Sequence, residues 1–353
     1  MLISLSNTSY LNLESSIDIP ALEARVEIEE EKYLISFIQD WLSTKDWFTF
    51  QTSGSTGSPK SIQLHRKTLE YSAHQTLKAV NLNAGDSDVS SLLCISPKYI
   101  GGIMVFVRAW LTNGKLKVLP AKTDFEALEE QYDLTSIVPL QVEKLLQKRT
   151  KTEKLQNVLI GGAPLSQGVE KKLAKHLHNS QNWYATYGMT ETASHVALRR
   201  IGKSIFEATG DVQFDVDHRG CLKIKGTITD NQNLKTNDMI DLHSSSRFEW
   251  KGRYDFIINS GGVMVNPEKV ELIISKMLGV NHLVVTWIPD ASLGQKVVCL
   301  SKEHFELSSL KEDYIHPYEK PKQLAIVDDL PSTLGGKLDR TACQLLAESV
   351  LIG

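Results

Sequence analysis

The sequence predicts an α/β protein with a large, layered N-terminal domain and a small α+β C-terminal domain. Short apolar strands alternate with helix-like stretches along the first 200 residues, which is typical of a layered α/β domain. Short strands separated by polar turns follow, and a second strand–helix alternation begins after residue 252. The chain of 353 residues is also longer than one typical domain, so two folding units are expected.

The strands expected in the first part are apolar runs that end in turn residues, at 90–96, 116–120, 135–140 and 156–165. The helices expected in this part are amphipathic stretches at 66–80, 142–149 and 167–179. In a layered α/β domain, ligands bind beyond the carboxyl ends of the strands. The turns that follow these apolar runs are therefore the places where a site is expected.

The elements expected after residue 200 are strands at 220–226, 246–252 and 282–288 and a helix at 267–278. Pro267 suits the first position of that helix, and Glu268 suits the positive end of its dipole. We place the domain boundary near residues 252–255. This gives an N-terminal domain of residues 1–254 and a C-terminal domain of residues 255–353, a common domain size.

Composition narrows the class of protein. Hydrophobic residues make up 41% of the chain, charged residues 23%, and the formal net charge is −3 with no long block of one sign, so nucleic acid or an anionic membrane is not expected as a partner. The apolar stretch 99–111 contains Arg108 and is shorter than the ~20 residues of a spanning helix, so a buried core element is expected. The start of the chain lacks signal-peptide character. The cysteines are isolated and predict neither a zinc site nor disulfides: Cys94, Cys221, Cys299 and Cys343. We expect a cytoplasmic enzyme, with a homo-oligomer left open.

The loop Thr52–Lys60 (TSGSTGSPK) has the composition of an anion-binding site. It contains three hydroxyl residues, two glycines and a terminal lysine: Ser53, Ser55, Thr56, Gly54, Gly57 and Lys60. Glycines let backbone N–H groups converge on an anion, and hydroxyl and ammonium groups add donors. Its spacing is not that of a Walker A loop or of a nucleophile elbow. Taken alone, it also fits a flexible turn.

Four further segments follow in order. Residues 184–192 (YATYGMTET) are expected to place Tyr187, Thr190 and Glu191 in one turn. The others are 236–238 (TND), 252–255 (GRYD) and 330–340 (LPSTLGGKLDR). In this order and spacing, the five segments resemble the motifs of the ANL superfamily, which contains acyl-CoA synthetases, adenylation domains of peptide synthetases and luciferases. The resemblance covers about residues 50–340.

The resemblance implies a site for ATP. The residues that would hold the β- and γ-phosphates are Thr52, Ser53, Gly54, Ser55, Thr56, Gly57 and Lys60. Tyr187, followed by Gly188, would stack on adenine, and a strand at the other face would be formed by Gly161, Gly162, Ala163 and Pro164. Thr190 would donate to the α-phosphate, and Glu191 would help to hold Mg²⁺, which prefers hard oxygen ligands. Asp238 would accept from the ribose hydroxyls, with Arg253 nearby.

The resemblance also implies a mobile C-terminal domain that serves two half-reactions. Lys337 would bridge the attacking carboxylate and the α-phosphate, where charge builds up in the transition state. Asp255 would be the hinge about which the domain rotates. In the second pose, a passage for the pantetheine arm of CoA would be formed by Ser260, Gly261 and Gly262, because glycines leave it unobstructed.

Two departures from the family pattern stand out. Relatives carry a longer region before the phosphate loop, whereas 51 residues precede Thr52 here, so we expect a shortened first subdomain. Asn237 stands where the family has glycine in a TGD turn. Asparagine tolerates left-handed backbone better than most residues, so we interpret the change as tolerated.

Residues 95–110 (ISPKYIGGIMVFVRAW) suggest the acid. This stretch resembles the acyl-pocket floor of compact o-succinylbenzoate–CoA ligases of menaquinone biosynthesis. The substrate-contacting residues would be Tyr99, Gly101, Gly102 and His195, with the glycines admitting the aromatic ring. The spare carboxylate of that acid has four unranked candidates: Lys98, Tyr99, His195 and Arg108.

Alternative interpretations remain open at this point. Taken singly, Tyr187 fits a core aromatic residue, the aspartates Asp238 and Asp255 fit turn formers, and Lys337 fits a solvated loop lysine. His195 and Arg108 also fit a satisfied helix side chain or a surface charge. For the whole chain, the alternatives are another aryl- or acyl-CoA ligase, an adenylation enzyme that loads a carrier protein, and a catalytically retired nucleotide-binding protein.

Overall fold

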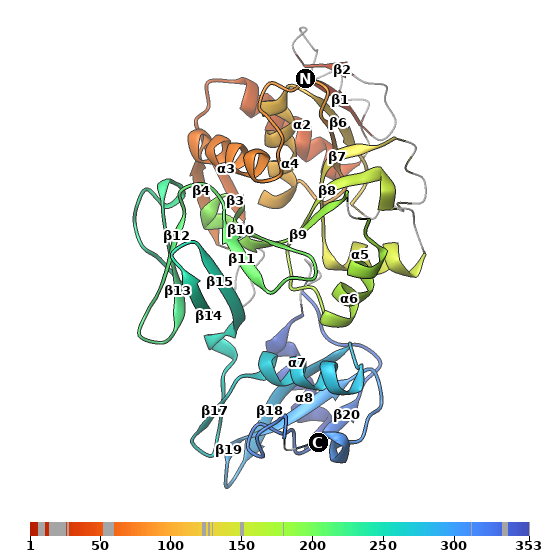
Figure 1. Ribbon diagram of the computed structural model, residues 1–353, viewed down its shortest axis with the longest axis vertical. Coiled ribbons are helices and arrows are strands. Elements are labelled where there is room, and N and C mark those ends of the chain that lie inside the picture. Colours follow the sequence, from red (N-terminus) through yellow and green to blue (C-terminus); the bar gives the residue numbers. More distant parts are fainter. Residues whose placement is uncertain are drawn as a thin grey trace.

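A computed structural model describes residues 1–5, 11–13, 26, 28–51, 60–121, 125, 128, 130–148, 152–178, 180–311, 313–333 and 338–352 of the chain. Over these residues it forms two lobes that follow one another along the long axis (Figure 1). The upper lobe is built on one large sheet with helices, and the lower lobe is built on a small sheet that carries α7 (Pro267–Leu278) and α8 (Arg340–Leu351).

The large sheet has the strand order β12-β13-β14-β15-β11-β10-β9-β8-β7-β5-β6-β1-β2. Its strands are β1 Leu2–Ser4, β2 Leu11–Asn12, β5 Ser90–Leu93, β6 Lys115–Val118, β7 Tyr132–Ile137, β8 Leu155–Ile160, β9 Asn182–Gly188, β10 His195–Arg200, β11 Ile205–Ala208, β12 Gln213–Val216, β13 Cys221–Lys225, β14 Leu234–Ser244 and β15 Arg247–Arg253. From β1 through β6, β5, β7 and β8 to β9 all neighbours are parallel, and from β9 to β12 all are antiparallel. A separate antiparallel hairpin pairs β3 (Trp47–Gln51) with β4 (Ser61–His65).

The helices of the upper lobe are α2 Glu29–Leu42, α3 Arg66–Ala79, α4 Ile100–Thr112, α5 Pro139–Gln147 and α6 Gln167–His176. Short 3-10 turns occur at η2 Thr152–Lys154, η3 Thr190–Thr192, η4 Thr227–Thr229, η5 Tyr254–Phe256 and η6 Leu307–Ser309. Helix α4 is apolar on nearly all sides and is buried along most of its length. This pattern is typical of a helix in the centre of a large core. The predicted buried core element at 99–111 is therefore confirmed.

The lower lobe contains β16 (Ile258–Ser260), β17 (Val263–Val265), β18 (Leu283–Asp290), β19 (Gly294–Ser301) and β20 (Leu324–Ile326). Its strand order is β17-β16-β19-β18, with β20 parallel to β19. Its two buried clusters draw on residues from Ile258 to Ala347, whereas the main cluster of the upper lobe draws on residues from Met1 to Phe248. The predicted boundary between residues 254 and 255 falls within η5, between these clusters.

The predicted α/β architecture is confirmed, and the elements that were predicted differ from the observed ones at their ends. The strand expected at 135–140 ends at Ile137, because Pro139 begins helix α5 instead. The strand expected over 156–165 ends at Ile160, so the prediction that Gly161–Pro164 is a strand was wrong. Gly162 there has φ +88°, a conformation that glycine adopts without strain, and the chain turns at this point.

Candidate functional site

The site begins where the parallel half of the large sheet meets the antiparallel half. β8 and β9 are parallel neighbours, so the Gly161–Pro164 turn after β8 lies beside the end of β9. Tyr187 belongs to β9 itself, while Thr190 and Glu191 belong to the turn η3. The prediction of all three residues in one turn was therefore wrong, although the structure keeps them adjacent. The end of a parallel strand is where α/β sheets bind ligands.

Two glycines of this region allow close backbone approach. A Cβ on Gly188 would collide with the backbone of Ser194 and His195, which lies on the antiparallel neighbour β10. A Cβ on Gly161 would lie 2.7 Å from Thr186 Oγ1. Gly161 thus lets the end of β8 lie close to β9, and Gly188 lets the end of β9 lie close to β10.

The carboxylate of Asp238, on β14, is held by two neutral donors. The Tyr187 hydroxyl donates to Asp238 Oδ2 over 2.8 Å, and the Trp250 indole Nε1 donates to Asp238 Oδ1 over 3.1 Å. Asp238 is 8% exposed. The Tyr187 ring packs edge-on against Phe248, with centroids 5.1 Å apart, and burial raises the pKa of Tyr187 well above its ordinary value. The two residues predicted to hold adenine and ribose are therefore directly bonded to each other.

Glu191 offers an exposed carboxylate for a cation. It lies in η3, which is closed by the N–H of Met189 donating to Thr192 Oγ1 over 3.1 Å. Mg²⁺ in nucleotide sites usually takes one or two carboxylates together with phosphate oxygens and water, so a single exposed glutamate fits its preference. Over the residues that the structure describes, no group of three His, Cys, Asp or Glu side chains could hold a metal by itself.

Arg108 is buried in the centre of the upper lobe. It lies on α4, is 1% exposed, and donates from Nη2 to Ser194 Oγ over 3.0 Å. Its Nε has no hydrogen-bond partner in the described part of the chain, and no ion pair to it occurs there. Burial lowers the pKa of Arg108 to about 9, so the side chain is still cationic at neutral pH. The alternative of a surface charge or a satisfied helix side chain is wrong for Arg108.

His195 extends this buried network. One alternative placed it on a helix, but it lies on a strand. It begins β10, its Nε2 lies 3.0 Å from Thr76 Oγ1, and its Nδ1 lies 3.3 Å from Ser194 Oγ. Burial, and then the charge of Arg108, lower the pKa of His195 well below its ordinary value, so the ring is neutral. His195 thus lies behind Ser194 as seen from Arg108.

The start of α4 presents the other predicted substrate residues. Tyr99 precedes the helix and is 39% exposed. A Cβ on Gly101 would lie 3.7 Å from Ile95 Cδ1, an ordinary contact. A Cβ on Gly102 would collide with the backbone of Ser96, so packing already explains that glycine. Whether either glycine admits an aromatic ring stays a prediction. Lys98 is exposed and its Nζ lies 3.5 Å from Glu29 Oε2.

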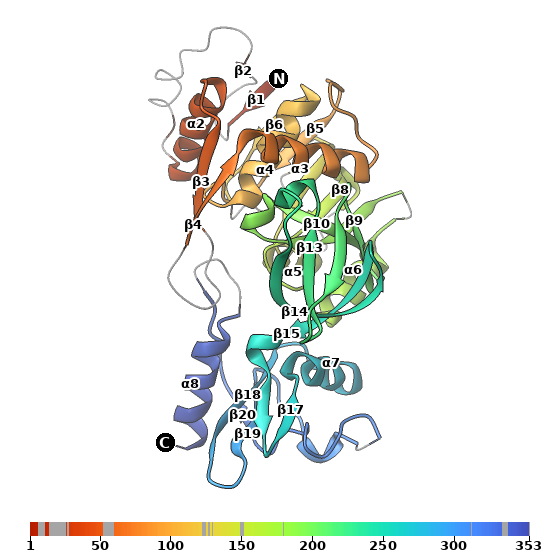
Figure 2. The ribbon, with the colours of Figure 1, turned by 90° about the vertical axis from the view of Figure 1, so that its left-hand side faces the viewer.

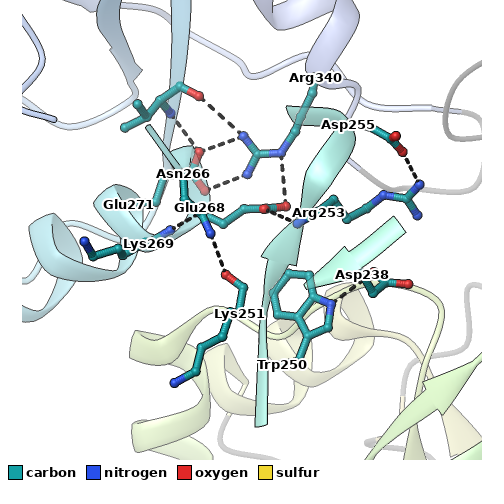
Figure 3. A network of polar contacts seen from close by, with 11 residues as sticks. Asp238, Trp250, Lys251, Arg253, Asp255, Asn266, Glu268, Lys269, Glu271 and Arg340 are labelled. Atoms are coloured by element: carbon teal, nitrogen blue, oxygen red, sulfur yellow. Dashed lines mark hydrogen bonds and ion pairs between the residues drawn. The ribbon is translucent and has the colours of Figure 1, made fainter. Parts of the chain in front are cut away.

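The segment between the lobes carries a polar network (Figure 3). Arg253 pairs with Asp255 over 2.5 Å, and the backbone N–H of Arg253 donates to Glu268 Oε2 over 2.7 Å. Arg340 binds Glu271 with both terminal nitrogens, over 2.9 and 2.7 Å, and its Nε lies 3.7 Å from Glu268. This brace between α7 and the start of α8 was missed by the sequence analysis. Its only sequence signal is a glutamate pair one helical turn apart, Glu268 and Glu271.

Asn237 bonds to the predicted hinge. Its Nδ2 donates to Asp255 Oδ1 over 2.8 Å, and its Oδ1 accepts from Arg219 Nη1 over 2.9 Å. Asn237 lies within strand β14 and is not among the residues with positive φ, so the interpretation through left-handed backbone was wrong. The asparagine amide instead links Arg219 to Asp255.

The remaining predicted residues fall in two groups. The first lies outside the described residues: Thr52, Ser53, Gly54, Ser55, Thr56, Gly57 and Lys337. The flanking strands β3 and β4 are described, with Gln51 paired to Ser61, and Lys60 is exposed. The second group is Ser260–Gly262, at the end of the β16–β17 hairpin. There Gly261 and Gly262 have φ +61° and +84°, and the turn lies at the end of the lower lobe away from the large sheet (Figure 1).

Among the described residues, no helix is long and apolar enough to span a bilayer.

Comparison with known proteins identifies the family. The family model described as AMP-binding enzyme matches residues 17–221, more than half of the chain. The chain therefore belongs to the AMP-binding enzyme family. The resemblance from the sequence motifs is confirmed at this level.

Several relatives and solved structures are similar to this chain. It is 28% identical to a 2-succinylbenzoate–CoA ligase of Listeria monocytogenes serotype 4b, over 86% of this chain and 71% of the relative. It is 25% identical to a ligase of the same name from Oceanobacillus iheyensis, over 84% and 69%. An acyl-CoA synthetase (AMP-forming)/AMP-acid ligase II-like protein of Dyadobacter fermentans superposes with TM-score 0.58 at 30% identity, over 90% of this chain and 95% of that one. An o-succinylbenzoate–CoA synthetase of Bacillus subtilis, solved with ATP and magnesium, shares the fold with TM-score 0.68 at 19% identity, over 83% and 68%.

Proposed function

We propose that this member of the AMP-binding enzyme family activates o-succinylbenzoate with ATP and then transfers the acyl group to CoA. The enzyme would thus be an acid–thiol ligase, and the reaction would be a step of menaquinone biosynthesis. The family match and the names of the similar ligases support an AMP-forming acid–CoA ligase. The observation that carries the choice of acid is the buried charge of Arg108, which has no ion-pair partner in the described part of the chain.

Arg108 fits the spare carboxylate of a dicarboxylic acid. A buried guanidinium is costly without an anion, and its planar fork matches a carboxylate better than any other side chain does. Of the four candidates, Lys98 is exposed and already paired with Glu29, and Tyr99 is 39% exposed. His195 is neutral and lies behind Ser194. We therefore place the spare carboxylate at Arg108 and Ser194, with His195 and Thr76 supporting the serine from behind.

The nucleotide would lie along the ends of β8 and β9. Tyr187 would stack on adenine, with the Gly161–Pro164 turn on the other face. Asp238 would bind the ribose, Thr190 would donate to the α-phosphate, and Glu191 would hold Mg²⁺, which neutralises charge on the phosphates when bound. The phosphates that leave as pyrophosphate would be held by Thr52–Lys60.

The two half-reactions would use two poses of the lower lobe. We propose that residues 1–254 and 255–353 are domains joined at Asp255, because the buried clusters divide there. The Ser260–Gly262 turn points away from the large sheet in this structure, so rotation would be needed to bring it to the site for CoA. Lys337 would act in the first half-reaction. ATP and CoA would be drawn from the cytoplasm, where we place the enzyme.

Pyrophosphate release across a panel of acids tests the proposal. We expect release with o-succinylbenzoate and little with benzoates or fatty acids. Release with those acids but not with o-succinylbenzoate would favour another acyl-CoA ligase. Release without transfer to CoA would favour an enzyme that loads a carrier protein. No release with any acid would favour a retired nucleotide-binding protein.

Lys337→Ala tests the two poses. Losing the bridging cation should slow adenylation by roughly two to three decades, about 3–4 kcal/mol, because the charge acts only in that transition state. Thioester formation from supplied acyl-adenylate should be spared. An equal loss in both half-reactions would contradict the two-pose scheme.

A further inference from the structure

Trp250 donates a hydrogen bond to Asp238, and it lies outside the five motif segments of the sequence. It lies on β15, is half-buried, and packs at the edge of the main core with Tyr187. Its indole Nε1 donates to Asp238 Oδ1 over 3.1 Å, while the Tyr187 hydroxyl occupies the other oxygen, Oδ2. Figure 3 shows the indole bond to Asp238. Because Trp250 lies on β15 and Tyr187 on β9, the carboxylate is fixed from two strands.

A bulge in β15 brings the indole to this position. Ile240 pairs with Trp250 and Met239 pairs with Gly252, so Lys251 is the extra residue between them. A bulge bends its strand and re-aims the neighbouring side chains. Gly252 within it has φ +136° and faces the Glu268 carboxylate, where a Cβ would collide. The backbone at 250–252 is thus shaped so that Trp250 and Asp238 meet.

The two bonds orient the carboxylate without saturating or neutralising it. Each carboxylate oxygen has two lone pairs, and Tyr187 and Trp250 each use one of them. The nearby guanidinium of Arg253 is paired with Asp255, and no ion pair to Asp238 occurs among the described residues. Among the described residues, one lone pair therefore remains on each oxygen of this fixed carboxylate. Two acceptors side by side match the two hydroxyls of a cis-diol.

We propose that Trp250 is a positioning residue that holds Asp238 for the two ribose hydroxyls of ATP. This rests on the proposed role of Asp238 in nucleotide binding, and it adds the residue that orients the carboxylate. Trp250 acts through Asp238 and does not itself contact the diol. Its effect must therefore depend on whether the nucleotide has those hydroxyls.

Equilibrium binding of ATP and of 2′,3′-dideoxy-ATP to the full chain tests the proposal by calorimetry, with no acid present. Trp250→Phe should weaken ATP binding about five- to tenfold, within the net effect of one typical hydrogen bond, and should change dideoxy-ATP binding less than about twofold. Trp250→His, which keeps a ring N–H, should recover part of the loss. Trp287→Phe, a half-buried tryptophan of the lower lobe, is the matched control and should alter neither affinity.

The outcomes separate the two levels of inference. Equal weakening of both nucleotides by Trp250→Phe would indicate a packing role and overturn the proposal alone. No weakening of ATP binding would overturn it as well. A wild-type chain that binds neither nucleotide would overturn the proposed function, and the role of Trp250 with it. Tyr187→Phe removes the other donor and should give the same dependence on the ribose hydroxyls.

Discussion

Two of the buried arginines of this chain, Arg340 in the lower lobe and Arg108 in the upper lobe, have opposite surroundings. Arg340 is 13% exposed, binds Glu271 through two hydrogen bonds and lies near Glu268, and these carboxylates raise its pKa despite burial. Arg108 is more deeply buried, has one hydroxyl partner, Ser194, and has a lowered pKa.

Under the proposed function, the difference separates a structural brace from a binding site. Desolvating a guanidinium costs several kcal/mol, and a bidentate carboxylate offsets much of that cost. Arg340 has its anion inside the chain, so its contacts are complete in the folded state. Arg108 lacks one among the described residues, so the fold bears the cost of a cation that only a bound anion would offset. Changing either arginine to methionine keeps much of its volume and therefore tests the comparison.

The largest effect on stability is expected for Arg340→Met. It leaves Glu268 and Glu271 with no cationic partner at a buried position, which should lower the free energy of unfolding by about 3–5 kcal/mol. Urea denaturation followed by tryptophan fluorescence measures this. Lys269→Met is the control, because Lys269 is 53% exposed and its pair with Glu319 should contribute less than about 1 kcal/mol. Equal losses for the two variants would remove the brace from the comparison.

Arg108→Met should reverse this pattern. Removing an uncompensated buried cation should leave the urea midpoint unchanged or higher. In contrast, kcat/KM for o-succinylbenzoate should fall at least about 100-fold, since a buried charge pair to the substrate is lost. Any residual turnover of a monocarboxylic benzoate should be unaffected. Loss of activity toward both acids alike would contradict a role specific to the second carboxylate.

The stability of the fold should depend on pH through Glu268, a member of the brace. Burial raises the pKa of Glu268 to about 7 from its ordinary value near 4.5, although Arg340 opposes the shift and Glu271 and Asp238 add to it. The folded state then binds more protons than the unfolded state between these values. Stability conferred by Glu268 is therefore present below pH 4.5 and lost as the pH rises to 7, by roughly 1–3 kcal/mol. As the pH rises across this window, the urea midpoint of wild type should fall relative to that of Glu268→Gln. Parallel curves would contradict the assignment.

The smallest effect is expected at the segment joining the lobes. Asn237→Gly removes the amide that links Arg219 to Asp255, which should cost about 1 kcal/mol and loosen the proposed hinge. Amide hydrogen exchange at residues 253–257 should become faster. Asn233→Gly, in the exposed turn before β14, makes the same change without those bonds and should leave exchange there unaltered. Unchanged exchange in Asn237→Gly would show that the amide does not restrain the hinge.

Much of the fold was predictable because its elements are defined by local patterns. Alternating apolar runs located the strands β5, β6, β7, β8, β13, β15 and β18, and amphipathic stretches located the helices α3, α5, α6 and α7. The ordered motifs located the family. Element ends were less predictable, since Pro139 can end a strand or begin a helix. The roles of the site residues stay predictions, and those of Thr52–Gly57 and Lys337 concern residues outside the described part of the chain.

The polar partners could not be predicted from the sequence because they depend on packing. Arg340 and Glu271 are 69 positions apart, and nothing local couples them. Arg108 was visible as a lone charge in an apolar run, but only its burial and unpaired Nε rank it above Lys98 and His195. Trp250 reaches Asp238 through a bulge, and a one-residue irregularity in strand register is not encoded by any periodicity.

Small polar groups take part in the contact between the lobes. Asn266 donates to the Lys251 carbonyl over 3.0 Å, and Asn281 lies so close to Gly168 on α6 that a methyl group there would not fit. Hydrogen bonds of this kind can be replaced by hydrogen bonds to water at little net cost in free energy. Separating a large apolar interface would cost more, because it exposes apolar surface to water. Under the proposed two-pose scheme, such contacts would hold the lobes in one pose and still allow them to separate at little cost.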